Sequence, residues 1–239
     1  MTMARHPKAR IFVRQRLFAG LKSFAELEQR LSVLPDEQAR GAAFEVFAEA
    51  YLAMQRKHDA AQVWPLPSAS LDLLQILGLS TNDYGVDGVL QATLGHLNVY
   101  QVKFRTNRQP LTWRELSTFI GQTDSLQIHN RVLFTNCDDL PSVMNERRGF
   151  FCIRGSDLDR LQKSDFTAIE NWLAGVIAPY VTGLIVSKTG NFYLAFSSAS
   201  VILLVGAVCY LFVVGEVAPV VWPAAAQPKR DSVGEGTNS

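Results

Sequence analysis

The chain has 239 residues with 23 Lys and Arg against 22 Asp and Glu, so its formal net charge is +1. This length suffices for one domain with an appendage, and the balanced charge excludes the global basic excess of many nucleic-acid-binding proteins. The three cysteines, Cys137, Cys152 and Cys209, are odd in number and lack C-x-x-C spacing, which argues against a disulfide framework or a zinc site. No apolar stretch follows the basic N-terminus, so no signal peptide is expected.

Two helices are expected near the N-terminus. Ser23 and Glu26 have the spacing of a capping box and predict a helix that Pro35 ends. A second helix follows, with Glu45 at the rim of its apolar stripe. Helical spacing defines that stripe, which consists of Phe44, Phe47, Ala48, Tyr51 and Leu52. Residues 1–35 are expected to form a basic helical segment in front of the main domain.

A hairpin is predicted at the centre of the chain, after a short strand at 62–66. Its strands cover about 85–91 and 98–104, joined by a turn through 93–96. Because side chains alternate along a strand, Tyr100, Val102 and Phe104 share one face, which can be buried. The other face carries Val99, Gln101, Lys103 and Arg105. It becomes polar toward its end, where a site could open.

Helices and strands alternate after the hairpin. Thr112 and Glu115 form a second capping-box pattern, predicting a helix to about Leu126. The stretches RVLFT (131–135) and GFFCI (149–153) predict two short strands, and Ser164 is expected to begin a helix that ends near Trp172. This order predicts an α/β fold with a mixed sheet flanked by helices.

The C-terminal quarter is different in character. Residues 192–214 contain no charged side chain, and this length can cross a bilayer. The alternative is a buried helix of a soluble domain. Residues 173–187 are also uncharged but include Pro179, and they form either a second, marginal span or an interfacial segment. We therefore expect one or two transmembrane helices over 173–215, contact with a membrane through 192–214, and a disordered tail over 216–239.

The polar end of the hairpin has the chemistry of a metal-dependent phosphodiesterase. Asp87 offers a carboxylate, Gln101 a side-chain carbonyl and Val102 a backbone carbonyl, and Mg²⁺ prefers such oxygen ligands. Lys103 would assist the attacking water and stabilise charge at phosphorus, and Glu45 would lend a second carboxylate. Taken singly, Asp87 is explained as a turn residue and Lys103 as a solvated charge on an edge strand.

The motifs Gly85-Val-Asp87-Gly and Gln101-Val-Lys103 resemble the PD-(D/E)xK nuclease superfamily, in particular its Mrr-type branch. The resemblance covers about residues 36–172 and includes the preceding helix with Glu45. It implies a restriction-endonuclease-like fold, an Mg²⁺-dependent DNA endonuclease, metal ligation by Asp87, Gln101 and Val102, and catalytic roles for Asp87, Gln101, Lys103 and Glu45. Gln101 stands where an acidic residue is commoner, so one ligand is neutral.

The expected partner of such a domain is DNA. Arg105, Arg108 and Arg114 follow the motif and could contact phosphates, or form an ordinary solvated face. A second copy of the chain is a further candidate partner. No helicase motor follows, so a helicase or restriction partner would be supplied separately. The scattered histidines, including His6, are expected at the surface.

Residues 181–214 resemble the last two helices of a major facilitator transporter. This stretch would be an anchor that holds a cytoplasmic nuclease domain at a membrane, the scar of a gene fusion, or part of an inactive remnant. Two other functions therefore stay open beside the nuclease. One is a DNA-binding module without catalytic activity, and the other is a membrane protein related to these transporters.

Overall fold

The computed structural model describes residues 5–54, 60–81, 85–125, 127–144, 147–175 and 177–213. The chain divides into two compact units, residues 1–184 and residues 185–239. The first unit contains the sheet and all the residues that the sequence predicts for the site.

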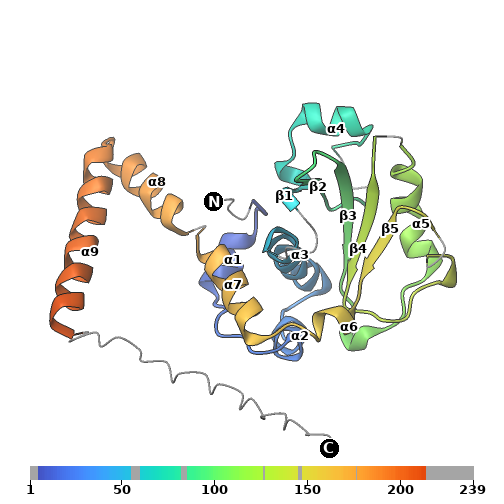
Figure 1. The fold of residues 1–239 in the computed structure, drawn as a ribbon, viewed down its shortest axis with the longest axis horizontal. Helices are drawn as coiled ribbons and strands as arrows, with labels where there is room; N and C mark the ends of the chain where they lie inside the picture. Colours follow the sequence, from blue (N-terminus) through green and yellow to red (C-terminus); the bar gives the residue numbers. More distant parts are fainter. Residues whose placement is uncertain are drawn as a thin grey trace, which may run out of the picture. The chain divides into compact units, whose positions relative to one another are not determined.

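Within the described residues, five strands form one mixed sheet in the order β1-β2-β3-β4-β5 (Figure 1). The pairs β1–β2 and β2–β3 are antiparallel, whereas the pairs β3–β4 and β4–β5 are parallel. A tight turn joins β2 to β3, whereas the parallel step from β3 to β4 requires a longer crossover. The strands are β1 (Ala60–Pro65), β2 (Gly88–Ala92), β3 (Leu97–Lys103), β4 (Asn130–Thr135) and β5 (Phe150–Ile153). The predicted hairpin and the two short apolar strands are therefore confirmed.

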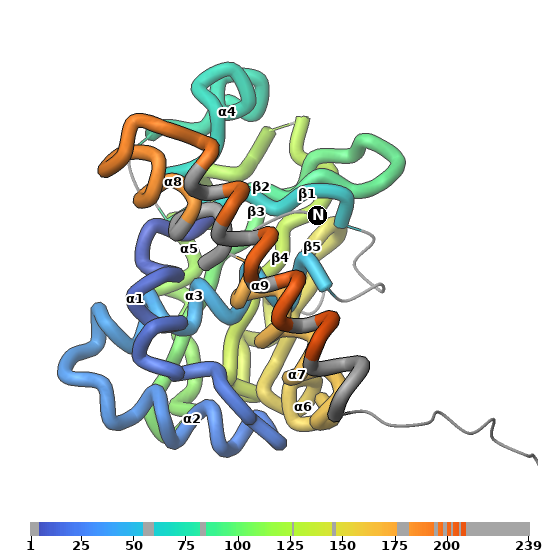
Figure 2. The backbone as a smooth tube through the Cα atoms, turned by 90° about the vertical axis from the view of Figure 1, so that its left-hand side faces the viewer, coloured from blue at the N-terminus to red at the C-terminus, as the bar shows by residue number. Residues whose placement is uncertain are grey.

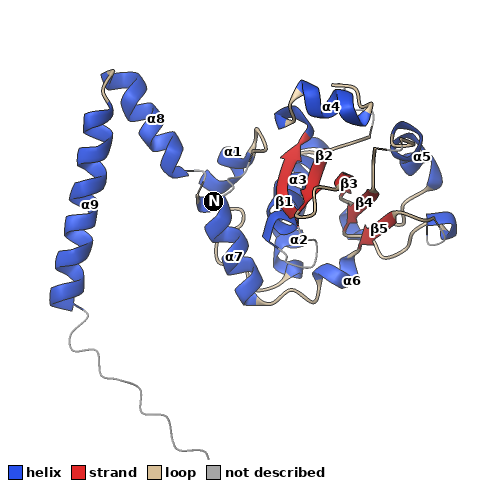
Figure 3. Ribbon diagram, turned by 45° about the horizontal axis from the view of Figure 1, so that its top comes forward, coloured by secondary structure: helices blue, strands red, loops and turns tan. Residues whose placement is uncertain are grey.

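Helices cover both faces of this sheet. The bounds are α1 (Ala9–Arg14), α2 (Phe24–Ser32), α3 (Glu37–Met54), α4 (Leu71–Leu77), α5 (Trp113–Gln122), α6 (Gly155–Leu158) and α7 (Lys163–Ala174). Single turns of 3₁₀ helix lie at Leu66–Ser68, Thr106–Arg108 and Ser142–Met144. Figures 1 and 3 show α3 and α5 on opposite sides of the strands. The predicted mixed sheet flanked by helices is thus present.

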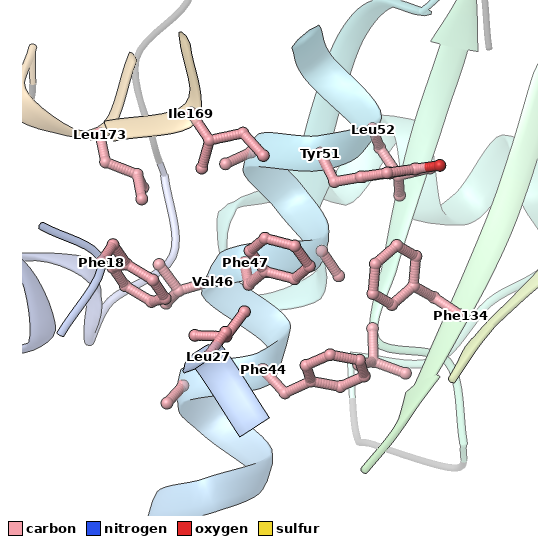
Figure 4. Packing of buried hydrophobic residues seen from close by; sticks show 14 of the residues in the cluster. Phe18, Leu27, Phe44, Val46, Phe47, Tyr51, Leu52, Phe134, Ile169 and Leu173 are labelled. Atoms are coloured by element: carbon pink, nitrogen blue, oxygen red, sulfur yellow. The ribbon is translucent and has the colours of Figure 1, made fainter. Parts of the chain in front are cut away.

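The core on the α3 side is aromatic. Phe44, Phe47 and Tyr51 are fully buried on α3 and contact Phe134 of β4 (Figure 4). Fully burying one such side chain contributes about 1.5–3 kcal/mol, so this helix fixes the sheet. Residues of α1, α2 and α7 join the same cluster, and Figure 2 shows α1 and α2 beside α3. Residues on both sides of the expected boundary at 35–36 belong to this cluster.

Local signals explain where the helices begin. Ser23 Oγ accepts from the Glu26 backbone N–H, and the Thr112 N–H donates to the Glu115 carboxylate over 2.8 Å. Both predicted caps are confirmed. The last helix of the sheet domain was expected to begin at Ser164, and that position is wrong. The cap is Gln162, because its N–H donates to the Asp165 carboxylate over 2.8 Å.

Two further helices follow, α8 (Ile177–Thr189) and α9 (Phe192–Val213). None of the helices in the described part of the chain combines the length and the apolar character that crossing a membrane requires. The one or two transmembrane helices expected over 173–215 therefore find no support among the described residues. For α8 the reason is its length of 13 residues, against the roughly 20 that a span needs. The predicted tail, residues 216–239, lies outside the described residues.

Candidate functional site at the start of strand β2

Asp87 immediately precedes β2, where the alternation of the strand is broken. Val86 and Val89 both belong to the apolar cluster on the α4 and α5 side, although an odd spacing would place them on opposite faces of a regular strand. The Asp87 N–H still donates to the Tyr100 carbonyl over 3.0 Å. Because the backbone is irregular here, strand alternation does not fix the direction of the Asp87 side chain, although the residue stays hydrogen-bonded to β3.

The Asp87 carboxylate lies against the backbone of β3. The Val102 N–H donates to Asp87 Oδ2 over 2.6 Å. Because the N–H groups of a strand lie in the plane of its sheet, this carboxylate oxygen lies close to that plane, in line with β2, and not over either face. The half-buried acid is thus placed beside the two residues that flank Val102.

Those flanking residues are Gln101 and Lys103, whose side chains lie on the α5 side. Gln101 is only 1% exposed, and a Cβ built on Gly85 would lie 3.1 Å from its Nε2. Within the described residues, Gln101 Oε1 has no hydrogen-bond partner. Lys103 is half-buried at the end of β3, and it forms no ion pair with any residue described. The structure thus brings Asp87, Gln101, Val102 and Lys103 to one place in the sheet.

Glu45 approaches from the opposite side. It lies on α3, which packs on the face formed by Tyr100 and Val102. Strand alternation places Gln101 and Lys103 on the other face. The structure therefore does not bring Glu45 together with this pair, although the sequence hypothesis placed all of them in one cluster. Instead, Glu45 Oε2 lies 3.0 Å from Nε2 of His6.

The segment in front of α1 is attached to α3 through acids. Glu49, one turn after Glu45, accepts the N–H of Arg5 over 2.6 Å and the N–H of His6 over 3.1 Å. Desolvation raises the pKa of this Glu49 carboxyl to about 7, and the two N–H bonds oppose the rise. His6 is 9% exposed, so its expected surface position is wrong, since the ring pairs with Glu45 instead.

The phenol of Tyr100 lies near all three acids. Burial raises its pKa well above the ordinary value, and the charges of Glu49, Asp87 and Glu45 raise it further, in that order. Nevertheless, among the residues described, no three His, Cys, Asp or Glu side chains are arranged to hold a metal ion.

The oxygen donors around Asp87 suit a different kind of cation site. Mg²⁺ is commonly bound through one or two carboxylates and keeps several waters. Asp87 supplies one carboxylate, and the backbone carbonyl of Val102 is a neutral oxygen on the adjacent strand. The buried Oε1 of Gln101, which lacks a partner within the described residues, is a third oxygen. This donor set fits Mg²⁺ in its chemistry.

Two of the three predicted DNA-contacting arginines are engaged with acids. Arg105 pairs with Glu115 and lies 3.5 Å from Glu37. Arg108 donates to both oxygens of Glu28 and to both oxygens of Asp159. Those bonds raise the pKa of Arg108 above its ordinary value. Both side chains therefore join parts of the fold.

Arg114 is exposed on the first turn of α5. It forms no ion pair with a described residue. Among the three arginines, Arg114 is therefore the one whose charge is available to a partner.

Sequence reasoning missed His6, Glu49 and Tyr100. Glu45 and Glu49 are four residues apart and so share one side of a helix, which could have been recognised. The phenol of Tyr100 was counted only as core. Nothing in the sequence indicates that His6 pairs with Glu45, because the two residues are 39 positions apart.

Comparisons with known proteins were made over the whole chain. No family model matches it, and no curated protein matches it. Among solved structures it is similar to one described as "ATP-dependent Type ISP restriction-modification enzyme LlaBIII bound to DNA", with a TM-score of 0.45 and 21% sequence identity. The match covers 59% of this chain and 8% of that chain, so this chain spans less than a tenth of its length. These comparisons assign no family to the chain.

Proposed function

We propose that the first compact unit hydrolyses DNA phosphodiester bonds with Mg²⁺, as the motifs around Asp87 and Lys103 imply. The observation that supports this most directly is the 2.6 Å hydrogen bond from the Val102 N–H to Asp87. It fixes the acid beside the strand that carries Gln101 and Lys103. Helix α3 precedes the two motifs and helix α5 follows them, as the resemblance implies.

Each residue has a distinct role in this proposal. Asp87, Gln101 and the Val102 carbonyl would hold the metal ion, which neutralises phosphate charge and acidifies a bound water. The Val102 N–H orients Asp87. Lys103 forms no ion pair with a described residue, so its ammonium is available to stabilise negative charge at the attacked phosphate.

Glu45 has a supporting role from the other face of the sheet. Its charge reaches Tyr100, as does the charge of Asp87, so the two acids act on one phenol from different elements. Glu45 already pairs with the His6 ring over 3.0 Å, and it is therefore less suited than Asp87 to touch a substrate. Exposed Arg114 would contact the DNA backbone, where Arg side chains position a duplex without reading its sequence.

The experiment is a nicking assay with the full chain on supercoiled plasmid in Mg²⁺. Asp87→Asn and Lys103→Met should each reduce the rate at least about 100-fold, as the loss of one electrostatic stabiliser does. Asp72→Asn and Lys163→Met change exposed residues of the same kinds and should leave the rate unchanged. Equal cleavage by the unmodified chain and by both site variants would refute the proposal.

A second candidate is a module that binds DNA without cutting it. The burial of Gln101 favours it, because a neutral amide at 1% exposure replaces the commoner acid and weakens metal binding. In this case DNA affinity would not depend on Mg²⁺, and no product would form at any Mg²⁺ concentration. Gel-shift titrations with and without chelator separate the two candidates.

A further inference from the structure

A pocket of about 340 Å³ opens on the α3 side of the sheet, beside the start of β3 and β4. Its floor and rim come from four strands and α6. The side chains that matter for its chemistry are Leu90, Asn98, Asn130, Val132, Phe151 and Asp157. Small-molecule sites in proteins have volumes of about 300–1,000 Å³, so this pocket is of the size that takes one compact ligand.

The strongest indication of a ligand is Asn98. Its side chain is 6% exposed, and within the described residues its Oδ1 has no hydrogen-bond partner. Buried polar atoms nearly always have one. Asn98 lines the pocket, so a molecule bound there would supply the missing partner.

The neighbours of Asn98 define the chemistry of that molecule. Asn130 is paired with Asn98 across β3 and β4, so the two amides lie side by side on one face. Leu90 and Val132 make an apolar floor. The Asp157 carboxylate accepts the Arg154 N–H over 3.1 Å, which fixes it at the rim as a further acceptor. The ligand should therefore be flat and apolar on its faces, with both N–H donors and acceptors at its edge.

Phe151 adds an aromatic surface. It lies on β5, an edge strand of the sheet, and 57% of it is exposed although it lines the pocket. Nucleobases stack on such side chains, and aromatic platforms of this kind occur widely in single-strand-binding proteins. An amide, in turn, presents a donor and an acceptor together, which matches the amino group and ring nitrogen of adenine.

We propose that this pocket binds an amino-bearing nucleobase, adenine or cytosine. Asn98 and Asn130 pair with the base edge, and Phe151 stacks on the base. The base is either that of a free nucleoside or one extruded from DNA, as in enzymes that flip bases. Only the DNA source rests on the proposed function. Asn98 precedes Val102 by four residues on β3, about 13 Å along a strand, so an extruded base would lie apart from the cut phosphate.

The first test measures nucleoside binding by the full chain in chelator, by calorimetry. Adenosine and cytidine should bind, whereas inosine and uridine, which carry a carbonyl in place of the amino group, should bind at least about tenfold more weakly. Asn98→Leu should reduce adenosine or cytidine affinity by a similar factor. Phe151→Ala should also weaken it, and this exposed residue can be changed without disturbing the core. Ile76→Ala, an exposed apolar residue on α4, is the matched control.

The second test compares DNA duplexes with and without one unpaired adenine. Preference for the unpaired adenine, lost in Asn98→Leu and Phe151→Ala, assigns the pocket to an extruded base. Nucleoside binding without that preference assigns it to a free nucleoside. Absence of both overturns the inference, as does binding that neither variant changes. Because neither test requires Mg²⁺ or cleavage, failure of the proposed hydrolysis leaves these results unaffected, and their failure leaves the hydrolysis untouched.

Discussion

The imidazole Nε2 of His6 lies 3.0 Å from Oε2 of Glu45. Together with the two backbone bonds to Glu49, this contact attaches the segment before α1 to the middle of α3. Ser68 Oγ also donates to the Arg5 carbonyl over 2.7 Å. The segment is therefore a structural part of the α3 side of the sheet, and its attachment depends in part on Glu49, whose pKa is raised to about 7.

The first prediction concerns the pH dependence of stability. The pKa of Glu49 is raised from 4.5 to about 7, so the folded chain binds this proton more tightly than the unfolded chain. The corresponding stabilisation is complete below about pH 4.5 and is lost as the pH rises through about 7. This protonation contributes about 3 kcal/mol to the free energy of unfolding at low pH. Urea unfolding across this range should show the decline.

The variant Glu49→Gln should remove most of that decline. The amide has no charge to desolvate, so the unfolding free energy should become nearly constant between pH 4.5 and 7. Glu37→Gln on the same helix is the control, since Glu37 is exposed, and it should keep the decline. An unchanged slope in Glu49→Gln would show that another group causes the pH dependence.

The second prediction concerns Arg108, which joins α2 to the segment after α6 through Glu28 and Asp159. Arg108→Met should lower the unfolding free energy by about 1–3 kcal/mol, because it removes several charge-assisted bonds and leaves their acids without a counter-charge. The partial exposure of Asp159 keeps the expected effect in this range. Arg114→Met, by contrast, should change the unfolding free energy by less than about 0.5 kcal/mol. Equal effects of the two substitutions in urea unfolding would contradict this role.

The third prediction concerns the close packing at Gly88. A Cβ built there would lie 2.3 Å from the Tyr100 ring and 2.4 Å from the Trp64 carbonyl. Gly88→Ala should therefore lower the unfolding free energy by about 1–3 kcal/mol or more. Gly41→Ala is the matched control, because nothing lies within 4 Å of its Cβ and it is inside α3. That change should stabilise by up to about 1 kcal/mol, so thermal melts should move in opposite directions.

The fourth prediction tests the cation site without an activity assay. Gln101→Glu places a carboxylate at a position that is 1% exposed, and without metal this should destabilise the chain by about 2–4 kcal/mol. If Mg²⁺ binds beside Asp87, saturating Mg²⁺ should restore much of the loss, since a ligand that binds only the folded state stabilises it. An identical loss with and without Mg²⁺ would argue against the site.

The fifth prediction concerns DNA binding by α5. Arg114→Gln should weaken binding to duplexes of any sequence and reduce the slope of log affinity against log salt by about 1, as expected for one phosphate contact. Lys163→Gln is the control on α7, which covers the opposite face of the sheet. A salt slope that both substitutions leave unchanged would exclude Arg114 from the interface.

Much of the fold could be predicted because it depends on local patterns. Alternation along β3 predicts the burial of Tyr100 and Val102, and both are buried. The pairs Ser23–Glu26 and Thr112–Glu115 predict helix starts, since each cap satisfies backbone groups within four residues. These features require no knowledge of the distant chain.

The rest depends on contacts between distant segments. Strand alternation already implies that Glu45 and Gln101 approach from different faces once α3 is placed, but the side on which α3 packs is decided by the aromatic core. The broken alternation before β2 has only a weak sequence signal, the two glycines Gly85 and Gly88, because glycine in a strand pattern suggests an irregularity but does not say how the neighbouring side chains point. Likewise, Arg108 pairs with Glu28, which is 80 residues away, and the sequence does not indicate which of the many acids this partner is.

The attachment of Arg5 and His6 to Glu49 has a practical consequence for protein engineering. A purification tag or fusion partner joined directly before Arg5 would begin beside Glu49 and Trp64, because the Arg5 guanidinium lies 5.3 Å from the Trp64 ring centre. Such an extension could disturb the contacts that Arg5 and His6 make with α3, the helix that carries Glu45. A flexible spacer between the tag and Arg5 should preserve the contacts of Arg5 and His6 with Glu49.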